Sequence, residues 1–350
     1  MGVISPNKLT ALLSAALLTV SISPHIYAHH SFATHYIPSQ SMELEGSVVE
    51  FSLRSPHSEM LLDVLGEDGQ VTQWSIEAAA SAHLQRMGIR RDTFGVGDTI
   101  KVVAWPNRKP GNPLVFGIGF VATNGEAYGS PPDLTLDTAA VSDSEATGIN
   151  SIVGRWQIPY PQRLAEPPMT LSNQGQTAWD NYDPQLSPAN TCETSSIPGI
   201  LYAPFLADIQ MTQDEVVFQF EHYALVRTVT LQDEPIASDP QGVFGQASGR
   251  IEDNALVIES SGYPASKWGL ALAAQVGADV PSSAQKSIVE SYSIADGGNT
   301  LNMAFSIEDP VYLSAPYEHV VSLKRVADDE PMFEFECELD SAERFSLDPE

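Results

Sequence analysis

The stretch KSIVESYSIADGGNTLNMAFSIEDP, residues 286–310, alternates apolar and polar side chains on both sides of the short segment Asp296–Asn299. A period of two indicates a β-strand with one face turned to a core, and Asp, Gly and Asn between two such runs indicate a turn. Two antiparallel strands are therefore predicted here. The same count places Glu290 on the face opposite to Val289 and Ser291.

Runs of the same kind fill the second part of the chain, which we take as residues 151–350. They lie between Ala207 and Leu339, and the last of them is MFEFECEL. Eight or nine short strands separated by polar turns predict an antiparallel β-barrel or sandwich. The segment Gly154–Trp156, GRW, resembles the Gly-x-Trp of lipocalins, and this resemblance implies a lipocalin-like barrel.

The first part of the mature chain, residues 29–128, has the pattern of a smaller β-domain. It contains the strand MELEGSVVEFSL, a hairpin that turns at Gly66–Gly69, and two later strands, GDTIKVVAWP and LVFGIGFVATNG. SAHLQRMGI predicts a short helix, with Ser81 as its N-cap and Gly88 as its stop. About 100 residues with one helix before the fourth strand predict a five-stranded barrel of the OB type, so the whole chain is predicted to be all-β.

Composition limits the partners of this chain. Its 350 residues suit two domains, and residues 129–150, rich in Pro, Ser, Thr and acids, are predicted to link them. The net charge is −28, from 45 acidic and 17 basic residues. Such a charge repels phosphate-rich surfaces, so nucleic acid and anionic membranes are not expected partners. No particular oligomeric state is predicted.

Residues 1–28 have the pattern of a secretory signal peptide. Lys8 precedes the apolar run LTALLSAALLTVSIS, Pro24 interrupts it, and Ala28 is the small residue that a signal peptidase accepts. We therefore expect a periplasmic or secreted protein with no membrane span after cleavage. The alternative is that the segment stays as a membrane anchor.

The chain has two cysteines, Cys192 and Cys337. They lie too far apart in sequence for a Cys-x-x-Cys motif. A disulfide between them is the natural expectation in an oxidising compartment, and two buried free thiols are the alternative.

The N-terminal part resembles an uncharacterised family of exported bacterial domains. The matching segments include AHHSFATHY, ELEGSVVEFSLRSPHSEMLLDV and WPNRKPGNPLVFG, although Ser55 stands where the family usually has Asn. The later segments resemble a β-barrel module often found behind that domain, but Gln246 and Ile251 replace its usual His and Trp. The resemblance implies a fold and an exported location, and no established activity.

Histidines near the predicted cleavage site suggest a metal site. Cleavage after Ala28 makes His29 the first residue, and its α-amine and ring Nδ1 form a chelate to which a second imidazole adds a third nitrogen. Such a nitrogen set suits Cu(II). His57, in the turn SPHSE, is the predicted second ligand, and His30 is the alternative. The alternative is an N-terminal tail whose histidines have no ligand.

A second constellation lies in the predicted larger barrel. Glu290 or Glu221 is a candidate general base, and Arg227 is a candidate anion holder. Period-two counting places Glu221 and Tyr223 on one face, with His222 opposite. The alternative is a structural salt bridge that closes the barrel, because a buried acid facing Arg227 has to be paired.

Candidate ligand contacts in the same barrel are Trp156, Tyr223, Arg227 and Glu259, whereas His319 is predicted at the surface or a sheet edge. The sequence has no Gly-x-Ser-x-Gly elbow, phosphate loop or dinucleotide fingerprint. We therefore expect a binding protein, with copper in the first barrel and a small hydrophobic or amphipathic ligand in the second. The alternatives are an acid/base enzyme acting on a hydrophobic substrate and an accessory subunit of an exported redox enzyme.

Overall fold

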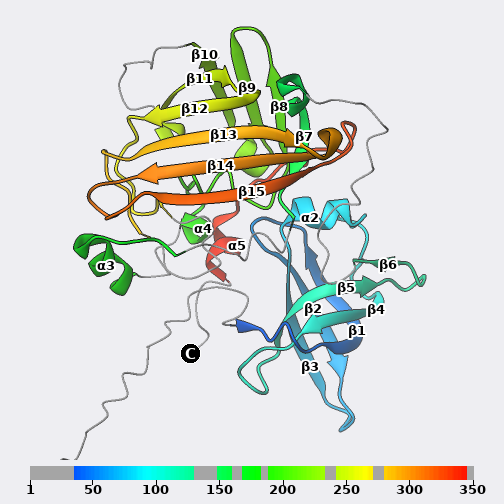
Figure 1. Ribbon diagram of the computed structural model, residues 1–350. Helices are drawn as coiled ribbons and strands as arrows, with labels where there is room; N and C mark the ends of the chain where they lie inside the picture. The colour runs from blue at the N-terminus through cyan, green and yellow to red at the C-terminus, as the bar shows by residue number, and fades with distance from the viewer. Residues whose placement is uncertain are drawn as a thin grey trace, which may run out of the picture.

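Two closed β-barrels, joined at one contact region, make up the fold (Figure 1). The computed structural model describes residues 35–129, 148–159, 168–182, 188–232, 242–270 and 280–344. The predicted all-β class is confirmed. The predicted signal peptide, His29, His30 and almost all of the predicted linker lie outside the described residues. No helix in the described ranges is long and apolar enough to cross a membrane.

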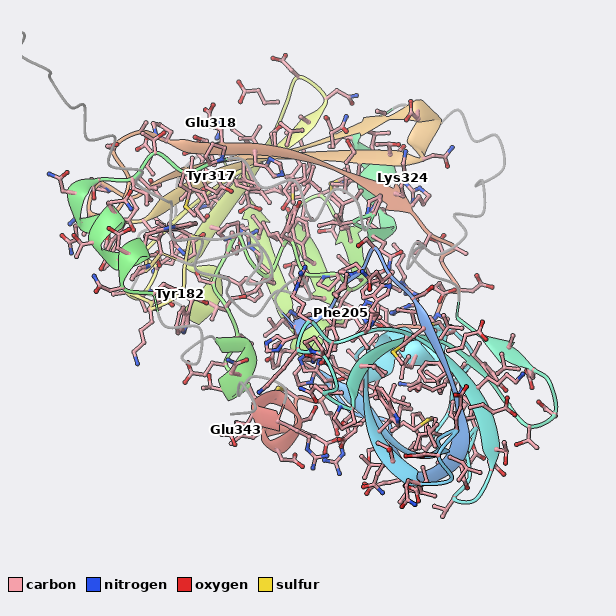
Figure 2. The ribbon with its side chains drawn as sticks, turned by 90° about the horizontal axis from the view of Figure 1, so that it is seen from below. Tyr182, Phe205, Tyr317, Glu318, Lys324 and Glu343 are labelled. Carbon is pink, nitrogen blue, oxygen red and sulfur yellow. A yellow bond between two sulfur atoms is a disulfide. The ribbon has the colours of Figure 1, made fainter. Side chains whose placement is uncertain are left out.

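The first barrel has the strand order of an OB fold. Its elements are β1 (Met42–Ser52), β2 (Ser58–Leu65), β3 (Val71–Ala78), α2 (Ser81–Arg86), β4 (Thr99–Trp105), β5 (Leu114–Val121) and β6 (Ala127–Tyr128). The order β3-β2-β1-β4-β5 closes because β3 and β5 pair in parallel. Figure 2 looks along this barrel, whose strands form a ring. Its core is formed by apolar side chains such as Leu62, Ile76 and Val102, which are fully buried.

The helix α2 differs from its predicted start. Its N-cap is Ala80, and Ser81 is the first helical residue, so the predicted Ser81 cap is wrong. The hydroxyl of Ser81 instead lies 2.8 Å from that of Ser55, in the loop before β2. The predicted stop is confirmed: the helix ends at Arg86 with Met87 as its C-cap, and Gly88 follows with a left-handed φ of 88°.

The second barrel closes with nine strands. They are β7 (Gly154–Gln157), β8 (Ala207–Met211), β9 (Glu215–Phe220), β10 (Val226–Leu231), β11 (Gln246–Glu252), β12 (Ala255–Ser261), β13 (Ser287–Ala295), β14 (Thr300–Glu308) and β15 (Tyr317–Arg325). The opening stretch of sequence forms β13 and β14 as predicted, joined by a 3-10 turn, η6 (Asp296–Gly298), in which Gly297 has a φ of 62°. Glu290 points inward and Val289 outward, as the period-two count predicts.

One end of this barrel is closed by the segment GRW and its surroundings. Trp156 is fully buried and donates its indole N–H to the carbonyl of Ile152, in the 3-10 helix η1 (Ile149–Ile152). The guanidinium of Arg325 covers the indole, 4.3 Å from the ring centroid, and donates to the carbonyls of Ser151 and Val153. This arrangement fixes the last strand to the first and supports the lipocalin-like prediction.

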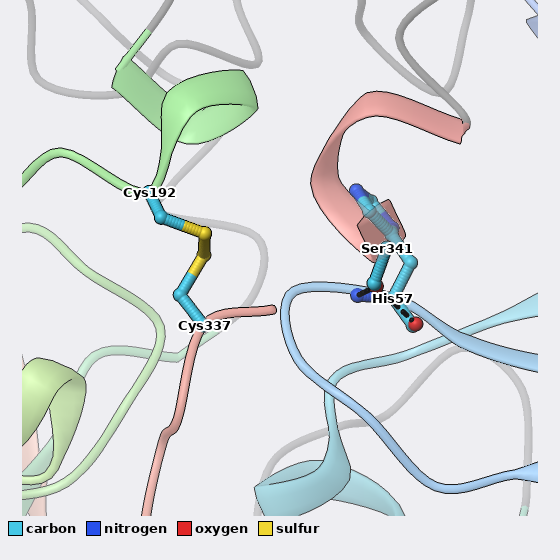
Figure 3. The surroundings of a disulfide bond; sticks show 4 residues. All are labelled: His57, Cys192, Cys337 and Ser341. Carbon is cyan, nitrogen blue, oxygen red and sulfur yellow. Dashed lines mark hydrogen bonds between the residues drawn. A yellow bond between two sulfur atoms is a disulfide. The ribbon is translucent and has the colours of Figure 1, made fainter. Parts of the chain in front are cut away.

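The chain after β15 leaves the second barrel and passes between the two domains. The predicted strand at 332–339 is wrong, because residues 332–336 form no ladder and Cys337 makes only an isolated bridge to Ser55 of the first barrel. The disulfide between Cys337 and Cys192 is present (Figure 3). The segment ends in α5 (Leu339–Arg344), which packs on α4 (Pro188–Thr191). The remaining short helices are α3 (Asn173–Asp180), η4 (His222–Ala224) and η5 (Gly242–Phe244).

Candidate functional site

The centre of the second barrel contains a buried ion pair. Arg227 on β10 donates from Nη1 and Nη2 to the two carboxylate oxygens of Glu290 on β13, both at 2.8 Å. Their side chains are 2% and 0% exposed. Burial alone would lower the pKa of Arg227, but the adjacent Glu290 outweighs it and the pKa is raised. The guanidinium of Arg227 therefore stays charged, and the predicted pairing of Arg227 with a buried acid is confirmed.

Two tyrosines surround this ion pair. Tyr292 donates its hydroxyl to Glu290 Oε2 at 2.6 Å, so each oxygen of this carboxylate has a donor and one of them has two. Burial raises the pKa of Tyr292 well above its usual value, which keeps the phenol protonated as a donor. Tyr263 bonds to Ser260 at 2.6 Å, and the buried ammonium of Lys286 lies 4.4 Å from its ring centroid.

Two buried nitrogen atoms inside this barrel have no hydrogen-bond partner among the described residues. They are Nε of Arg227 and Nε2 of His319. His319 belongs to the inward-facing set of β15, together with Tyr317 and Val321, so its predicted surface position is wrong. Its ring lies 5.9 Å from both Tyr202 and Phe305, and it keeps partial exposure to solvent. His319 therefore lies where the lumen meets the solvent.

Glu221 has a different environment from the one predicted. Strand β9 ends at Phe220, and the chain turns through Tyr223 and Ala224, which both have left-handed φ values, so the period-two count fails here. The carboxylate of Glu221 forms a salt bridge with Arg86 from helix α2 of the first barrel. It also accepts the backbone N–H groups of Leu206 and Phe333. Glu221 thus joins the two barrels and does not face Arg227.

An aromatic cluster adjoins this salt bridge. His222 stacks on Phe205 with centroids 4.7 Å apart, and Phe335 and Tyr223 pack on its other sides. Phe205 lies between the barrels in Figure 2, and the ring of His83 from α2 lies 4.9 Å from it. Burial lowers the pKa of His222 to about 4, so the ring is neutral at physiological pH. Tyr223 therefore lies in the domain junction, outside the lumen.

The remaining predicted ligand contacts also lie elsewhere. Glu259 is on the outer face of β12, where it pairs with Arg250 at 2.6 Å. Trp156 is enclosed by the closed end of the barrel, as described above. Of the four predicted ligand contacts, only Arg227 lies at the polar centre of the lumen.

His57 has the geometry of an oriented histidine. Its Nδ1 lies 2.8 Å from Oε1 of the buried Glu77, and Tyr36 donates its hydroxyl to the other oxygen of that carboxylate. Burial and the adjacent Glu77 raise the pKa of Tyr36, which keeps it a donor. The backbone of His57 is held as well, because Ser341 of α5 accepts from its N–H and donates to its carbonyl (Figure 3).

No cluster of three or more His, Cys, Asp or Glu side chains suited to a metal occurs within the described ranges. His57 and Glu77 alone do not make such a set. The predicted partners of His57, His29 and His30, precede the first described residue.

These features define a two-barrel protein in which an OB-type domain is fixed to a larger, lipocalin-like barrel. A family model described as "Family of unknown function (DUF6152)" matches residues 16–113, which include most of the first barrel. This match confirms the similarity of the N-terminal part to an uncharacterised family. No curated protein and no solved structure is detectably similar to the chain.

Sequence reasoning misplaced His319 and missed other residues of these sites, Arg86 among them. His319 could have been found, because Tyr317, His319, Val321 and Leu323 alternate along one strand and place the histidine with three inward apolar residues. Arg86 had no such signal. It lies 135 residues from its partner Glu221 and on another domain, and only the docking of the two barrels brings the pair together.

Proposed function

We propose that this chain is an exported binding protein whose second barrel holds a small hydrophobic or amphipathic molecule. The support is the inner face of this barrel, where apolar and aromatic side chains surround a few fixed polar groups, the kinds of side chain that line ligand sites. The half-buried His319 lies toward one end of the barrel, while Trp156 and Arg325 close the other.

One observation favours binding over acid/base catalysis. The buried carboxylate of Glu290 already accepts three hydrogen bonds from Arg227 and Tyr292, whereas a general base has to present a lone pair to its substrate. The other candidate base, Glu221, is occupied by Arg86 and two backbone N–H groups. Both carboxylates thus have the environment of structural charges.

Two neighbouring valines on β15 offer a test. Val321 faces the lumen and is 1% exposed, whereas Val320 faces outward and is 62% exposed. Titration calorimetry with 1-octanol should show binding to the wild type and to Val320→Phe. Val321→Phe should lose this binding because the added ring fills the lumen. Equal binding by the two folded variants would place the site elsewhere, and no binding by the wild type would refute the proposal.

The exported location is part of the same proposal. Its support is the signal-like pattern of residues 1–28, ending at Ala28. N-terminal sequencing of the protein recovered from expressing cells should begin at His29. Recovery of an intact Met1 end would contradict cleavage.

A second candidate function, copper binding in the first barrel, is supported by the Glu77–His57 contact. Histidines that ligate metals commonly give one ring nitrogen to a carboxylate, which fixes the tautomer and raises the basicity of the other. Here Nδ1 contacts Glu77, so Nε2 would be the ligating atom, together with the amine and ring of His29. These residue types fit Cu(II).

Electron paramagnetic resonance tests the copper site. Protein that begins at His29 should bind Cu(II) with nitrogen couplings, and one extra Ala before His29 should abolish the chelate. Glu77→Gln should weaken Cu(II) binding by about 10- to 100-fold, while His319→Phe, in the other barrel, serves as the matched control. Identical spectra with and without the extra Ala would exclude the N-terminal chelate.

A further inference from the structure

Arg227 has an unused donor in an otherwise saturated site. Its two Nη atoms are held by Glu290, its guanidinium lies 5.8 Å from the ring centroid of Phe218, and the side chain is 2% exposed. Its Nε–H has no acceptor among the described residues. Buried donors are nearly always satisfied, and those next to a charge have the most to lose. An acceptor from outside the described chain would complete this site.

The strand register places a second unsatisfied nitrogen on the wall that carries Glu290, the partner of Arg227. Glu290 pairs with Phe305, and Phe305 pairs with His319, so the three side chains lie side by side on the inner face of β13, β14 and β15. Two strand spacings separate Glu290 from His319, about 10 Å. Burial lowers the pKa of His319, and its neutral ring can still donate one hydrogen bond.

The electrostatic setting favours an anion over a neutral acceptor. Glu290 balances the charge of Arg227, and Lys286 is a further buried cation: its Nζ donates to Ser196, Ile197 and Gly269 and lies over the ring of Tyr263. Hydrogen bonds from a charged donor to a carboxylate are about twice as strong as those between neutral groups.

The position along the barrel limits the size of the ligand. The closed end, at Arg325, lies six residues along β15 from His319, about 20 Å. That end is occupied by Trp156, and the middle by Tyr292 and Phe218, which are all buried. A ligand would therefore have to lie in the half of the barrel toward His319, which limits it to a short chain.

We infer that the ligand is a small amphipathic carboxylate whose headgroup accepts the Nε–H of Arg227, with its apolar part packed toward Phe305 and His319. This inference rests on the proposed function of the second barrel. It adds the chemical class of the ligand and names His319 as a contact.

Calorimetry on the full chain with octanoate and 1-octanol separates the contribution of the headgroup to binding from that of the apolar tail. The wild type should bind octanoate at least tenfold more tightly than 1-octanol. Arg227→Lys keeps a cation opposite Glu290 but lacks the Nε–H, so it should lose that preference and keep the binding of 1-octanol. Arg250→Lys, on the outer face, is the matched control and should behave as the wild type.

The outcomes are distinct. Equal affinity of the wild type for octanoate and 1-octanol overturns the carboxylate inference and leaves lumen binding standing. Binding of neither molecule overturns both. If Arg227→Lys does not fold, NMR of the wild-type protein provides the test. Octanoate, but not 1-octanol, should shift a slowly exchanging arginine Nε–H signal. A signal that exchanges with water and ignores octanoate means that a water molecule fills the position, which also overturns the inference.

Discussion

The salt bridge between Arg86 and Glu221 should be worth several kcal/mol to the folded state when one partner is removed. The side chains are 5% and 0% exposed, and one oxygen of Glu221 serves Arg86 and Phe333 while the other accepts from Leu206. Glu221→Gln leaves the buried Arg86 with the longer ion pair to Glu330, 3.7 Å away, a loss of about 3 kcal/mol. It also turns an amide N–H toward the backbone N–H of Leu206, and a lost buried hydrogen bond adds about 1 kcal/mol.

Urea unfolding followed by tryptophan fluorescence measures these costs. Arg86→Met should cost about 3 kcal/mol, because it leaves the carboxylate of Glu221 buried with only two backbone donors. The double variant removes both charges, so its cost should fall at least 2 kcal/mol below the sum of the single variants. Costs that add to within about 0.5 kcal/mol, or a loss below 1 kcal/mol for Glu221→Gln, would refute this account of the junction.

Three further predictions concern other contacts. Serine at both Cys192 and Cys337 should lower the free energy of unfolding by about 5 kcal/mol in the chain-entropy model, since the bridge spans 145 residues; no change on reduction would contradict this. The pKa of His222 falls from 6.5 unfolded to about 4 folded, so the folded state binds fewer protons and stability should fall between pH 6.5 and 4, by up to roughly 3 kcal/mol. His222→Phe should show a shallower pH profile, and parallel profiles would exclude this residue. Arg325→Met removes donors to three backbone carbonyls and should cost about 2–4 kcal/mol in thermal unfolding, whereas the exposed Arg250→Met should cost under about 0.5 kcal/mol; equal losses would argue against its closing role.

Local periodicity predicted the barrels because most strands here are regular. The count around Glu290 holds since β13 and β14 pair without a bulge over nine residues, from Ser287 to Ala295. The count at Glu221 fails because the chain makes a left-handed turn at Tyr223 and Ala224, and the sequence EHYAL contains no Gly or Asn to announce it. The apolar run at 332–339 fails for another reason: its aromatic residues pack in the domain junction without a strand partner.

The candidate site residues were predictable only where the pattern within a single strand indicates the direction of the side chain. Glu290 and Arg227 each lie within a strand of alternating apolar and polar residues, so their inward position could be expected. Which acid faces the arginine could not be predicted. The contact of His57 with Glu77 depends on the alignment of β2 with β3, in which Glu59 pairs with Glu77, and on the loop before β2. Contacts of this kind are set by packing between elements, and a single sequence does not specify them.

The C-terminal segment gives the two proposed sites a common support. Cys337 is fixed to the second barrel by the disulfide, and the next residue, Glu338, donates its backbone N–H to the carbonyl of Ser55. Three residues later, Ser341 holds the backbone of His57 at both N–H and carbonyl. The loop that carries His57 is thus tied through a few residues to the larger barrel. A rigid support of this kind reduces the freedom that a histidine loses on binding a ligand. The proposed metal site would therefore depend on the domain junction as well as on the first barrel.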